Sequence, residues 1–546
     1  MGTNANASMN NLFRIFTVPE APDSTLGKLD QAISQNLAGF LQQHIVAEET
    51  DLSVLERDFT DTDIPDRPVF VSEQTQFLLD KVVAQSVHTA SPSFIGHMTS
   101  ALPYFMIPLS KIMIALNQNL VKTETSKAFT PLERQVLGML HRLVFQQDEA
   151  FYGRWLHDSH QHLGAFCSGG TVANITALWA ARNSAFGPQG NFRGINKEGL
   201  FAAMRHYDCE GAAILVSERG HYSLSKAADV LGIGREQIVA VPTDGSNRIC
   251  VDALQVQIRQ LRERNIRPFA VVGIAGTTET GNIDPLDAVA DVAAAEGLHF
   301  HVDAAWGGPT LFSDRYRGKL KGIERADSVT IDAHKQLYVP MGVGLVVFKD
   351  PAKLGSIEHH AQYIIRQGSK DLGSTTLEGS RPGMAMLVHS ALRIIGRRGY
   401  QLLIDLGIEK AARFAELIDE RQDFELITDP ELNILTYRWL PAGFAGALAD
   451  ASPSVARKAN DILNSITRHI QKTQREHGKA FVSRTRLTPE RYGQQPIVVF
   501  RVVLANPLTD EQTLVDVLDE QAEIASSDAL AGRLEELRQL LGRPAA

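Results

Sequence analysis

The feature that most constrains the fold is a regular alternation of short strand-like runs and helical patterns between about residues 160 and 350. The strand-like runs are GAAILVS, QIVAVP, PFAVVGIAG, LHFHVDA, SVTIDA and GVGLVVF. Helical patterns such as LDAVADVAAAEG lie between them. Short β-branched strands that alternate with helices are typical of an α/β layer with a mostly parallel sheet. In such sheets, ligands bind beyond the carboxyl ends of the strands.

The segments on either side of this layer have other patterns. Apolar residues with helical spacing predict an N-terminal helical region that follows an irregular polar tail of about 25 residues. After a helix over about 385–420, the strand-like runs LNILTYRWL and IVVFRVVLAN enclose a long helical pattern. We therefore expect three units: a tail and helical segment (1–130), a large α/β domain (131–395) and a small α+β domain (396–546).

The composition excludes several classes of function. The formal net charge of −9 argues against a nucleic-acid partner, because such proteins usually present a basic surface. The chain has neither the run of roughly 18 apolar residues that a membrane span needs nor a basic start followed by an apolar run. Cys167, Cys209 and Cys250 form no CxxC pair, so neither a disulfide framework nor a thiolate metal site is expected. We expect a soluble, unexported, cytoplasmic protein.

The stretch GAFCSGGTVANITALWAARNSAF predicts a site for an anion. Small residues that include Gly170 and Thr171 lead directly into a helix, whose first backbone N–H groups and positive end suit a phosphate. Alone, a Ser-Gly-Gly sequence is more often a flexible loop in which Thr171 or Ser168 caps a helix.

Two charged residues follow predicted central strands. Asp303 directly follows the strand residues LHFHV, and Lys335 comes 32 residues later, directly after SVTIDAH. A lysine in partly apolar surroundings keeps a reactive neutral amine, which Schiff-base chemistry requires. Each residue also has an ordinary explanation, because an aspartate can cap a turn and a lysine can lie along a strand edge.

Taken together, the phosphate loop, the carboxylate and the lysine match the needs of pyridoxal 5′-phosphate. This cofactor requires an anion site, a partner for its aldehyde and an acid that keeps its pyridine nitrogen protonated. His221, in VSERGHYSLSKAADVLGIG, follows another predicted strand and could stack on the cofactor ring, although a buried histidine more often has a structural role.

The chain resembles the group II pyridoxal-dependent amino acid decarboxylases over roughly residues 80 to 510. The resemblance rests on five motifs in one order: CSGGTVAN, ERGHYSLSKAADVLGIG, AGTTETGNIDPLDAVADVAAAEGLHFHVDAAWGG, SVTIDAHKQLYVPMGVG and STTLEGSRPG. It implies a fold type I architecture and a homodimer with the active site at the interface. It also implies α-decarboxylation of a small amino acid, and within the family the similarity is greatest to the bacterial branch that acts on aspartate.

The resemblance also implies a role for each matching residue. Lys335 would form the covalent link to the cofactor, Asp303 would pair with the pyridine nitrogen, and His221 would stack on the ring. The remaining cofactor contacts would come from Gly170, Thr171, His334, Thr278 near the ring hydroxyl, and Ser380, which can reach across from the partner subunit. Arg501 would pair with a substrate carboxylate, although a strand-edge arginine is the other explanation.

The proton donor and the substrate are less constrained. Many family members carry a tyrosine on a mobile loop that supplies a proton, whereas residues 364–379 of this chain contain none. Tyr363, just before this loop, and His221 are the candidate donors. We expect L-aspartate to be converted to β-alanine, with glutamate, cysteine sulfinate or an aromatic amino acid as alternatives. Donors for an acidic side chain could come from GHMTSALP or NQNLVKTE.

Two other classes of function compete with an enzyme of this kind. A pyridoxal-phosphate-binding protein without catalysis would have the same fold, but the intact set Lys335, Asp303, His221 and Arg501 argues against it. The run HDSHQHL, with His157, His160 and His162, has spacings that a metal site could use, but no carboxylate or cysteine partner completes the set.

Overall fold

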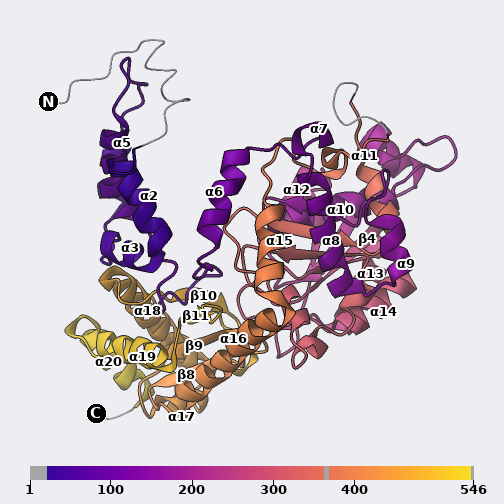
Figure 1. Ribbon diagram of the computed structural model, residues 1–546. Coiled ribbons are helices and arrows are strands. Elements are labelled where there is room, and N and C mark those ends of the chain that lie inside the picture. Colours follow the sequence, from indigo (N-terminus) through magenta and orange to yellow (C-terminus); the bar gives the residue numbers. More distant parts are fainter. Residues whose placement is uncertain (1–20, 362–367, 543–546) are drawn as a thin grey trace.

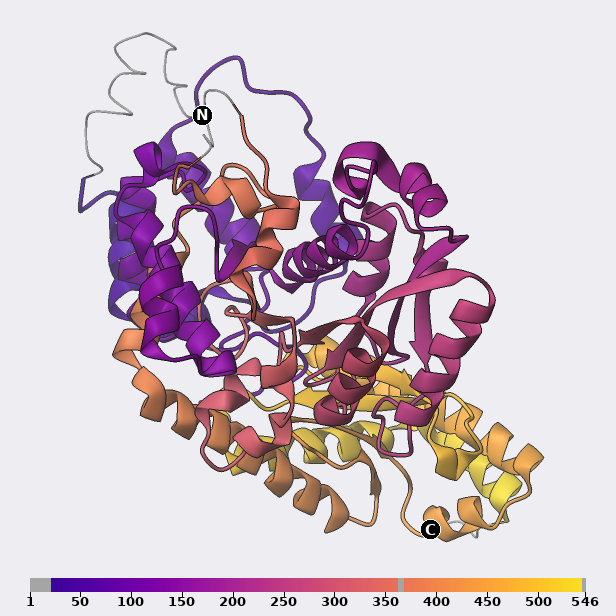
Figure 2. The ribbon, with the colours of Figure 1, turned by 90° about the vertical axis from the view of Figure 1, so that its right-hand side faces the viewer.

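The computed structural model describes residues 21–361 and 368–542, and its centre is a mixed seven-stranded sheet (Figures 1 and 2). The strand order is β1-β7-β6-β5-β4-β2-β3. The strands are β1 (Gly164–Cys167), β2 (Gly211–Ser217), β3 (Ile238–Val241), β4 (Ile266–Ile274), β5 (His299–Asp303), β6 (Ser328–Asp332) and β7 (Gly344–Phe348). Strands β6, β5, β4, β2 and β3 are parallel, and β7 is antiparallel to both β6 and β1. The predicted mostly parallel α/β sheet is confirmed.

Helices cover both faces of this sheet, which explains why its strands are nearly continuous apolar runs. On one face α10 (Gly170–Ala185) and α12 (Tyr222–Val230) contact the strands. On the other face lie α8 (Phe129–Phe145), α13 (Val251–Glu263) and α14 (Leu286–Glu296). The helices α9 (Glu149–Trp155) and α11 (Ile195–His206) complete this part of the chain.

A second, antiparallel sheet lies in the C-terminal region in the order β10-β11-β9-β8. Its strands are β8 (Phe424–Thr428), β9 (Ile434–Trp439), β10 (Ser483–Leu487) and β11 (Ile497–Val503). The helices of this region are α16 (Gly396–Asp419), α17 (Phe444–Ala449), α18 (Pro453–His477), α19 (Glu511–Ala525) and α20 (Asp528–Leu541). Helices α16, α18 and α19 contact the sheet, as an α+β arrangement requires.

The helix predicted over 385–420 is two helices, α15 (Ala385–Ile394) and α16. The break falls at Gly396, whose φ of 68° lies in the left-handed region that interrupts a right-handed helix. The apolar pattern continues through the break, because both helices bury one face. For that reason periodicity alone did not reveal it.

Most of the N-terminal helices lie to one side of the large sheet (Figure 1). They are α2 (Thr25–Gln35), α3 (Leu37–His44), α4 (Leu52–Leu55), α5 (Val71–Phe77) and α6 (Met106–Leu116), whereas α7 (Thr123–Ser126) contacts α8. Between α5 and α6 the chain crosses to the C-terminal sheet, where the N–H of Ile95 donates to the carbonyl of Phe481 and the N–H of Val503 donates to the carbonyl of Ile95. The residues that follow Ile95 are thereby held beside the large sheet. None of the described helices is long and apolar enough to cross a membrane.

Candidate active site

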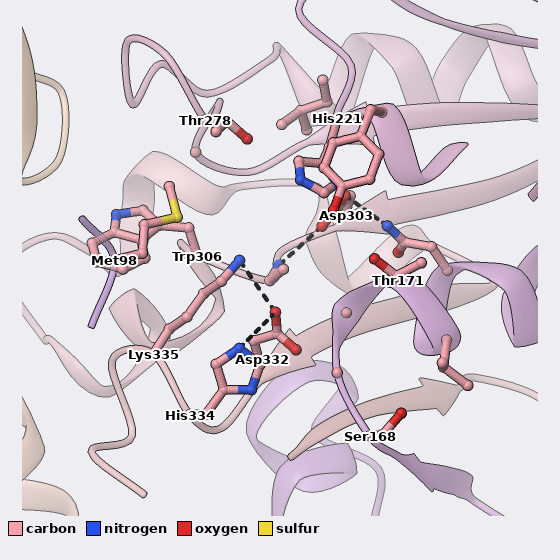
Figure 3. Close-up of a pocket in the computed structure, with 18 of the residues that line it drawn as sticks. Met98, Ser168, Thr171, His221, Thr278, Asp303, Trp306, Asp332, His334 and Lys335 are labelled. Atoms are coloured by element: carbon pink, nitrogen blue, oxygen red, sulfur yellow. Dashed lines mark hydrogen bonds and ion pairs between the residues drawn. The ribbon is translucent and has the colours of Figure 1, made fainter. Parts of the chain in front are cut away.

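A cavity of about 350 Å³ lies at the carboxyl ends of the central strands, next to the first turn of α10 (Figure 3). Its size is in the range of small-molecule sites. Seven of the residues singled out in the sequence line it: Gly170, Thr171, His221, Thr278, Asp303, His334 and Lys335. The sheet explains why they meet, because β4, β5 and β6 are adjacent and parallel, so their carboxyl ends share one edge.

The first turn of α10 forms one end of the cavity. The preceding residue, Gly169, has no side chain that could cap the helix, so the first N–H groups of this helix are available to a bound anion. A Cβ atom at Gly170 would lie only 2.7 Å from Asp332 Oδ2, which excludes a larger residue there. His334 lies beside this turn and its Nδ1–H donates to the carbonyl of Val343 at 2.8 Å. This end of the cavity fits the phosphate group of pyridoxal phosphate.

Lys335 points into the cavity from the loop after β6 (Figure 3). Its Nζ is 3.1 Å from Asp332 Oδ2, and its side chain is 19% exposed. The other oxygen, Asp332 Oδ1, is buried without a hydrogen-bond partner among the described residues. Asp332 was missed in the sequence, although a strand-terminal carboxylate three residues before a candidate reactive lysine is a usable signal. It keeps the amine of Lys335 close to the strand ends.

Asp303 and His221 lie on the side of the cavity opposite Lys335 (Figure 3). Asp303 is 7% exposed and accepts hydrogen bonds from the N–H of Ala305 at 3.1 Å and from Asn174 Nδ2 at 2.9 Å. His221 precedes α12, and its Nδ1 accepts from the N–H of Ser223. Burial lowers the pKa of His221, so its imidazole is neutral at neutral pH.

Arg501 lies directly behind the wall of the cavity and does not line it. Its Nε donates to the carbonyl of Thr278 at 2.7 Å, and its Nη1 donates to the carbonyl of Gly96 at 3.3 Å. Nη2 is buried without a hydrogen-bond partner among the described residues. Burial lowers the pKa of Arg501 to about 10, which still leaves the guanidinium charged at neutral pH.

Ser380 does not line this cavity either. It is exposed and accepts a hydrogen bond from Asn119 Nδ2 at 2.9 Å. Its predicted contact would have to come from a second copy. Tyr363 lies outside the described residues.

The cavity also contains residues that sequence reasoning did not single out. Arg219 lines it, and its Nε is buried without a partner in the part of the chain that the structure describes. Of the two segments considered for substrate donors, GHMTSALP contributes Met98. The second, NQNLVKTE, contributes no lining residue, and its Asn119 binds Ser380 instead.

The histidine run gives no support for a metal site. Burial lowers the pKa of His162 to about 3, and its Nε2 is buried without a hydrogen-bond partner among the described residues. Across residues 21–361 and 368–542, no three histidine, cysteine, aspartate or glutamate side chains are grouped as metal ligands would be.

Comparisons with known proteins agree with this fold and site. The family described as "Pyridoxal-dependent decarboxylase conserved domain" matches residues 56–440, so the chain belongs to the pyridoxal-dependent decarboxylases. The cofactor of this family is pyridoxal 5′-phosphate, and the residues that line the cavity fit this cofactor. The predicted fold type I architecture is confirmed by solved structures of such decarboxylases.

The chain is 64% identical to the aspartate 1-decarboxylase of Aliivibrio fischeri over 538 residues, which cover 98% of both proteins. It is 28% identical to the cysteine sulfinic acid decarboxylase of Mus musculus, over 82% of this chain and 84% of that protein. The crystal structure of mouse CSAD in apo form superimposes with a TM-score of 0.76 at 25% identity, covering 91% of this chain and 99% of that one.

Proposed function

We propose that this enzyme removes the 1-carboxylate of L-aspartate and releases β-alanine and carbon dioxide. Two observations support the substrate. The first, which carries the proposal, is the identity to an aspartate 1-decarboxylase over nearly the whole of both chains. The second is a pair of guanidinium groups with buried unpartnered nitrogens: Arg219 Nε in the lining of the cavity, and Arg501 Nη2 behind the wall that Thr278 forms. A guanidinium pairs well with a carboxylate, so Arg219 would bind one carboxylate of the substrate, and Arg501 would bind the other if the wall at Thr278 moves to admit it.

When bound, pyridoxal phosphate supplies an electron sink for the electrons that the departing carboxylate leaves behind. The first turn of α10 and His334 would hold its phosphate, and Lys335 would hold its aldehyde carbon. Asp303 would keep a negative charge opposite the ring nitrogen and so hold a proton there. Thr278 would lie near the ring hydroxyl, with His221 against the ring face. These residue roles are part of the proposal.

Arg501 would bind a substrate carboxylate and so orient the bond that breaks. Its position is set by the carbonyls of Thr278 and Gly96, which come from the large domain and from the N-terminal segment. A small displacement of either segment would therefore move the guanidinium. The proton that replaces the lost carboxylate would come from Tyr363 or from His221.

We expect product analysis to identify the substrate. L-Aspartate, L-glutamate, cysteine sulfinate and L-tyrosine are offered together to the holoenzyme, and the amines are identified by mass spectrometry while carbon dioxide is measured. β-Alanine should be the dominant product. A pocket discriminates one methylene by only about 1–3 kcal/mol, so a minor glutamate product roughly 10- to 200-fold weaker is compatible with the proposal. γ-Aminobutyrate as the main product would contradict it, and no carbon dioxide from any substrate would favour a non-catalytic protein.

We also propose that the protein is a cytoplasmic homodimer built from the three units expected from the sequence (1–130, 131–395 and 396–546). Most of the exposed large hydrophobic side chains lie in the first 116 residues, on the helices at one side of the molecule and on the loops between them. On α6, Ile112 is 50% and Ile114 is 68% exposed. A concentration of exposed apolar residues is typical of an association surface, and a two-fold dimer is the commonest closed form.

Analytical ultracentrifugation tests the dimer. The protein should sediment at twice the chain mass of 59.9 kDa. The double variant Ile112→Lys/Ile114→Lys should sediment as one chain, because two charges cannot be buried at an apolar interface. Phe201→Lys is the matched control, since Phe201 is 85% exposed on α11 and belongs to the large α/β part of the chain, and the variant should remain dimeric. A single-chain mass for the unaltered protein would rule the dimer out.

A further inference from the structure

Asn174 lies at the centre of a buried hydrogen-bond network that the roles above do not explain. It belongs to the first turns of α10, lines the cavity and is 1% exposed. Its amide nitrogen donates to Asp303 Oδ2 at 2.9 Å and to Ser223 Oγ at 3.1 Å. Its amide oxygen is 3.1 Å from His301 Nε2. One side chain thus links two residues assigned to cofactor contacts with the interior of the sheet.

The carboxylate of Asp303 determines whether the nitrogen or the oxygen of the Asn174 side-chain amide faces it. An ionised carboxylate only accepts hydrogen bonds, so the amide nitrogen has to face it. The amide oxygen then faces His301, and His301 has to carry a proton on Nε2. Thr330 Oγ1 lies farther from this nitrogen, at 3.5 Å. Burial lowers the pKa of His301, so the ring is neutral and its Nδ1 is an acceptor.

The hydrogen-bond network continues from His301 to Ser328 and His299, and each of these groups again donates in the direction of Asp303. The hydroxyl of Ser328 donates to His301 Nδ1 at 2.8 Å, and it accepts from His299 Nε2 at 2.8 Å. Burial lowers the pKa of His299 to about 3, so this ring is also neutral. His299, Ser328, His301 and Asn174 therefore donate in succession towards Asp303. Aligned donors of this kind support a buried negative charge, and none of the four neutralises it.

A second arm leads from Asn174 to His221. Ser223 Oγ accepts from the amide of Asn174 and lies 2.8 Å from His221 Nδ1. The same Nδ1 accepts from the backbone N–H of Ser223 at 3.2 Å. A ring nitrogen that accepts hydrogen bonds carries no proton, so the proton of the neutral His221 ring is on Nε2.

We propose that Asn174 is a positioning residue that couples the negative charge of Asp303 to the proton position of His221, because a single amide nitrogen donates to both arms. Without it, Asp303 loses a donor, His301 loses an acceptor, and Ser223 loses the contact that orients its hydroxyl. The proposal rests on the roles assigned to Asp303 and His221 towards the cofactor. It does not depend on which amino acid is the substrate.

The test uses holoenzyme reconstituted with pyridoxal phosphate that carries 15N in its ring. The 15N resonance distinguishes a protonated from a neutral ring nitrogen. In Asn174→Leu the resonance should move from the protonated towards the neutral position, and the dissociation constant for pyridoxal phosphate should rise about tenfold, as expected for the loss of a hydrogen bond to a charged group. Ser223→Ala interrupts only the His221 arm, so the resonance should stay in place while turnover falls about tenfold.

Asn183→Ala is the matched control, because Asn183 is also buried on α10 but binds Arg182 and the carbonyl of Ser356 instead. Its resonance should equal that of the unaltered enzyme. Asp303→Asn tests the underlying role: if it leaves the resonance unchanged, the assignment of Asp303 is wrong. If Asp303→Asn shifts the resonance and Asn174→Leu does not, the coupling by Asn174 is wrong.

Should Asn174→Leu fail to fold, Ser328→Ala takes its place, because it removes one donor from the same succession at a position outside the cavity. It should shift the resonance in the same direction by a smaller amount. An unchanged resonance in Ser328→Ala would then overturn the succession of donors.

Discussion

Replacing Lys335 with alanine should lower decarboxylase turnover by at least about 10⁴-fold, the scale of effect seen when an essential nucleophile is removed. The amine is the only one that lines the described cavity, and it lies at the strand ends beside Asp332. The variant also leaves Asp332 without its cation, so its melting temperature and cofactor content should be measured beside carbon dioxide release. An added primary amine small enough for the vacated space, such as methylamine, should restore part of the activity.

Lys349→Ala serves as the control for this variant, because Lys349 is exposed after β7 and does not line the cavity. It should keep full turnover. In the unaltered enzyme, borohydride reduction followed by peptide mapping should find the cofactor on the peptide that contains Lys335. Cofactor on a different lysine would refute the assignment, whatever the activity of the alanine variant.

The large sheet was predictable because most of its strands are recognisable in the sequence as continuous apolar runs. Five of its seven strands are parallel and covered on both faces, so runs such as GAAILVS and PFAVVGIAG are continuously apolar. The strands that were missed lack this signal. β1 has only four residues, and β8, with the sequence FELIT, buries only its two end residues. β10, with the sequence SRTRL, is partly exposed and carries two arginines. Their places are set by pairing with β7, β9 and β11, which is long-range information.

The predictable part of the candidate site consists of residues that directly follow a recognisable strand. Asp303 and Lys335 could be brought together because β5 and β6 follow each other in the chain and pair in parallel. The roles of Asn174 and Asp332 could not be predicted, since they depend on which atom faces which across the sheet. Arg501 was identified by the resemblance, but its place behind Thr278 depends on how the C-terminal sheet docks. Local patterns contain no information about that docking.

Replacing Asp303 with asparagine should lower turnover on the order of 10³-fold, while the protein keeps its fold. Asparagine has nearly the same shape, but it is neutral and cannot hold a proton on the ring nitrogen of the cofactor. The succession of donors from His299 to Asn174 would then point at a group without negative charge. The single amide oxygen of asparagine could accept from the Ala305 N–H or from Asn174, but not from both. Turnover and the absorbance of the bound cofactor measure the effect.

The comparison that isolates the charge is Asp350→Asn. Asp350 also accepts the backbone N–H of the residue two positions on, Ala352, but it follows β7 at the opposite edge of the sheet. Loss of that contact should leave turnover and cofactor absorbance unchanged. If Asp303→Asn retained more than about a tenth of the activity, the negative charge of Asp303 would not be what holds the cofactor in its reactive form. The buried donors aligned towards Asp303 would then serve only to fill the interior between β5, β6 and α10.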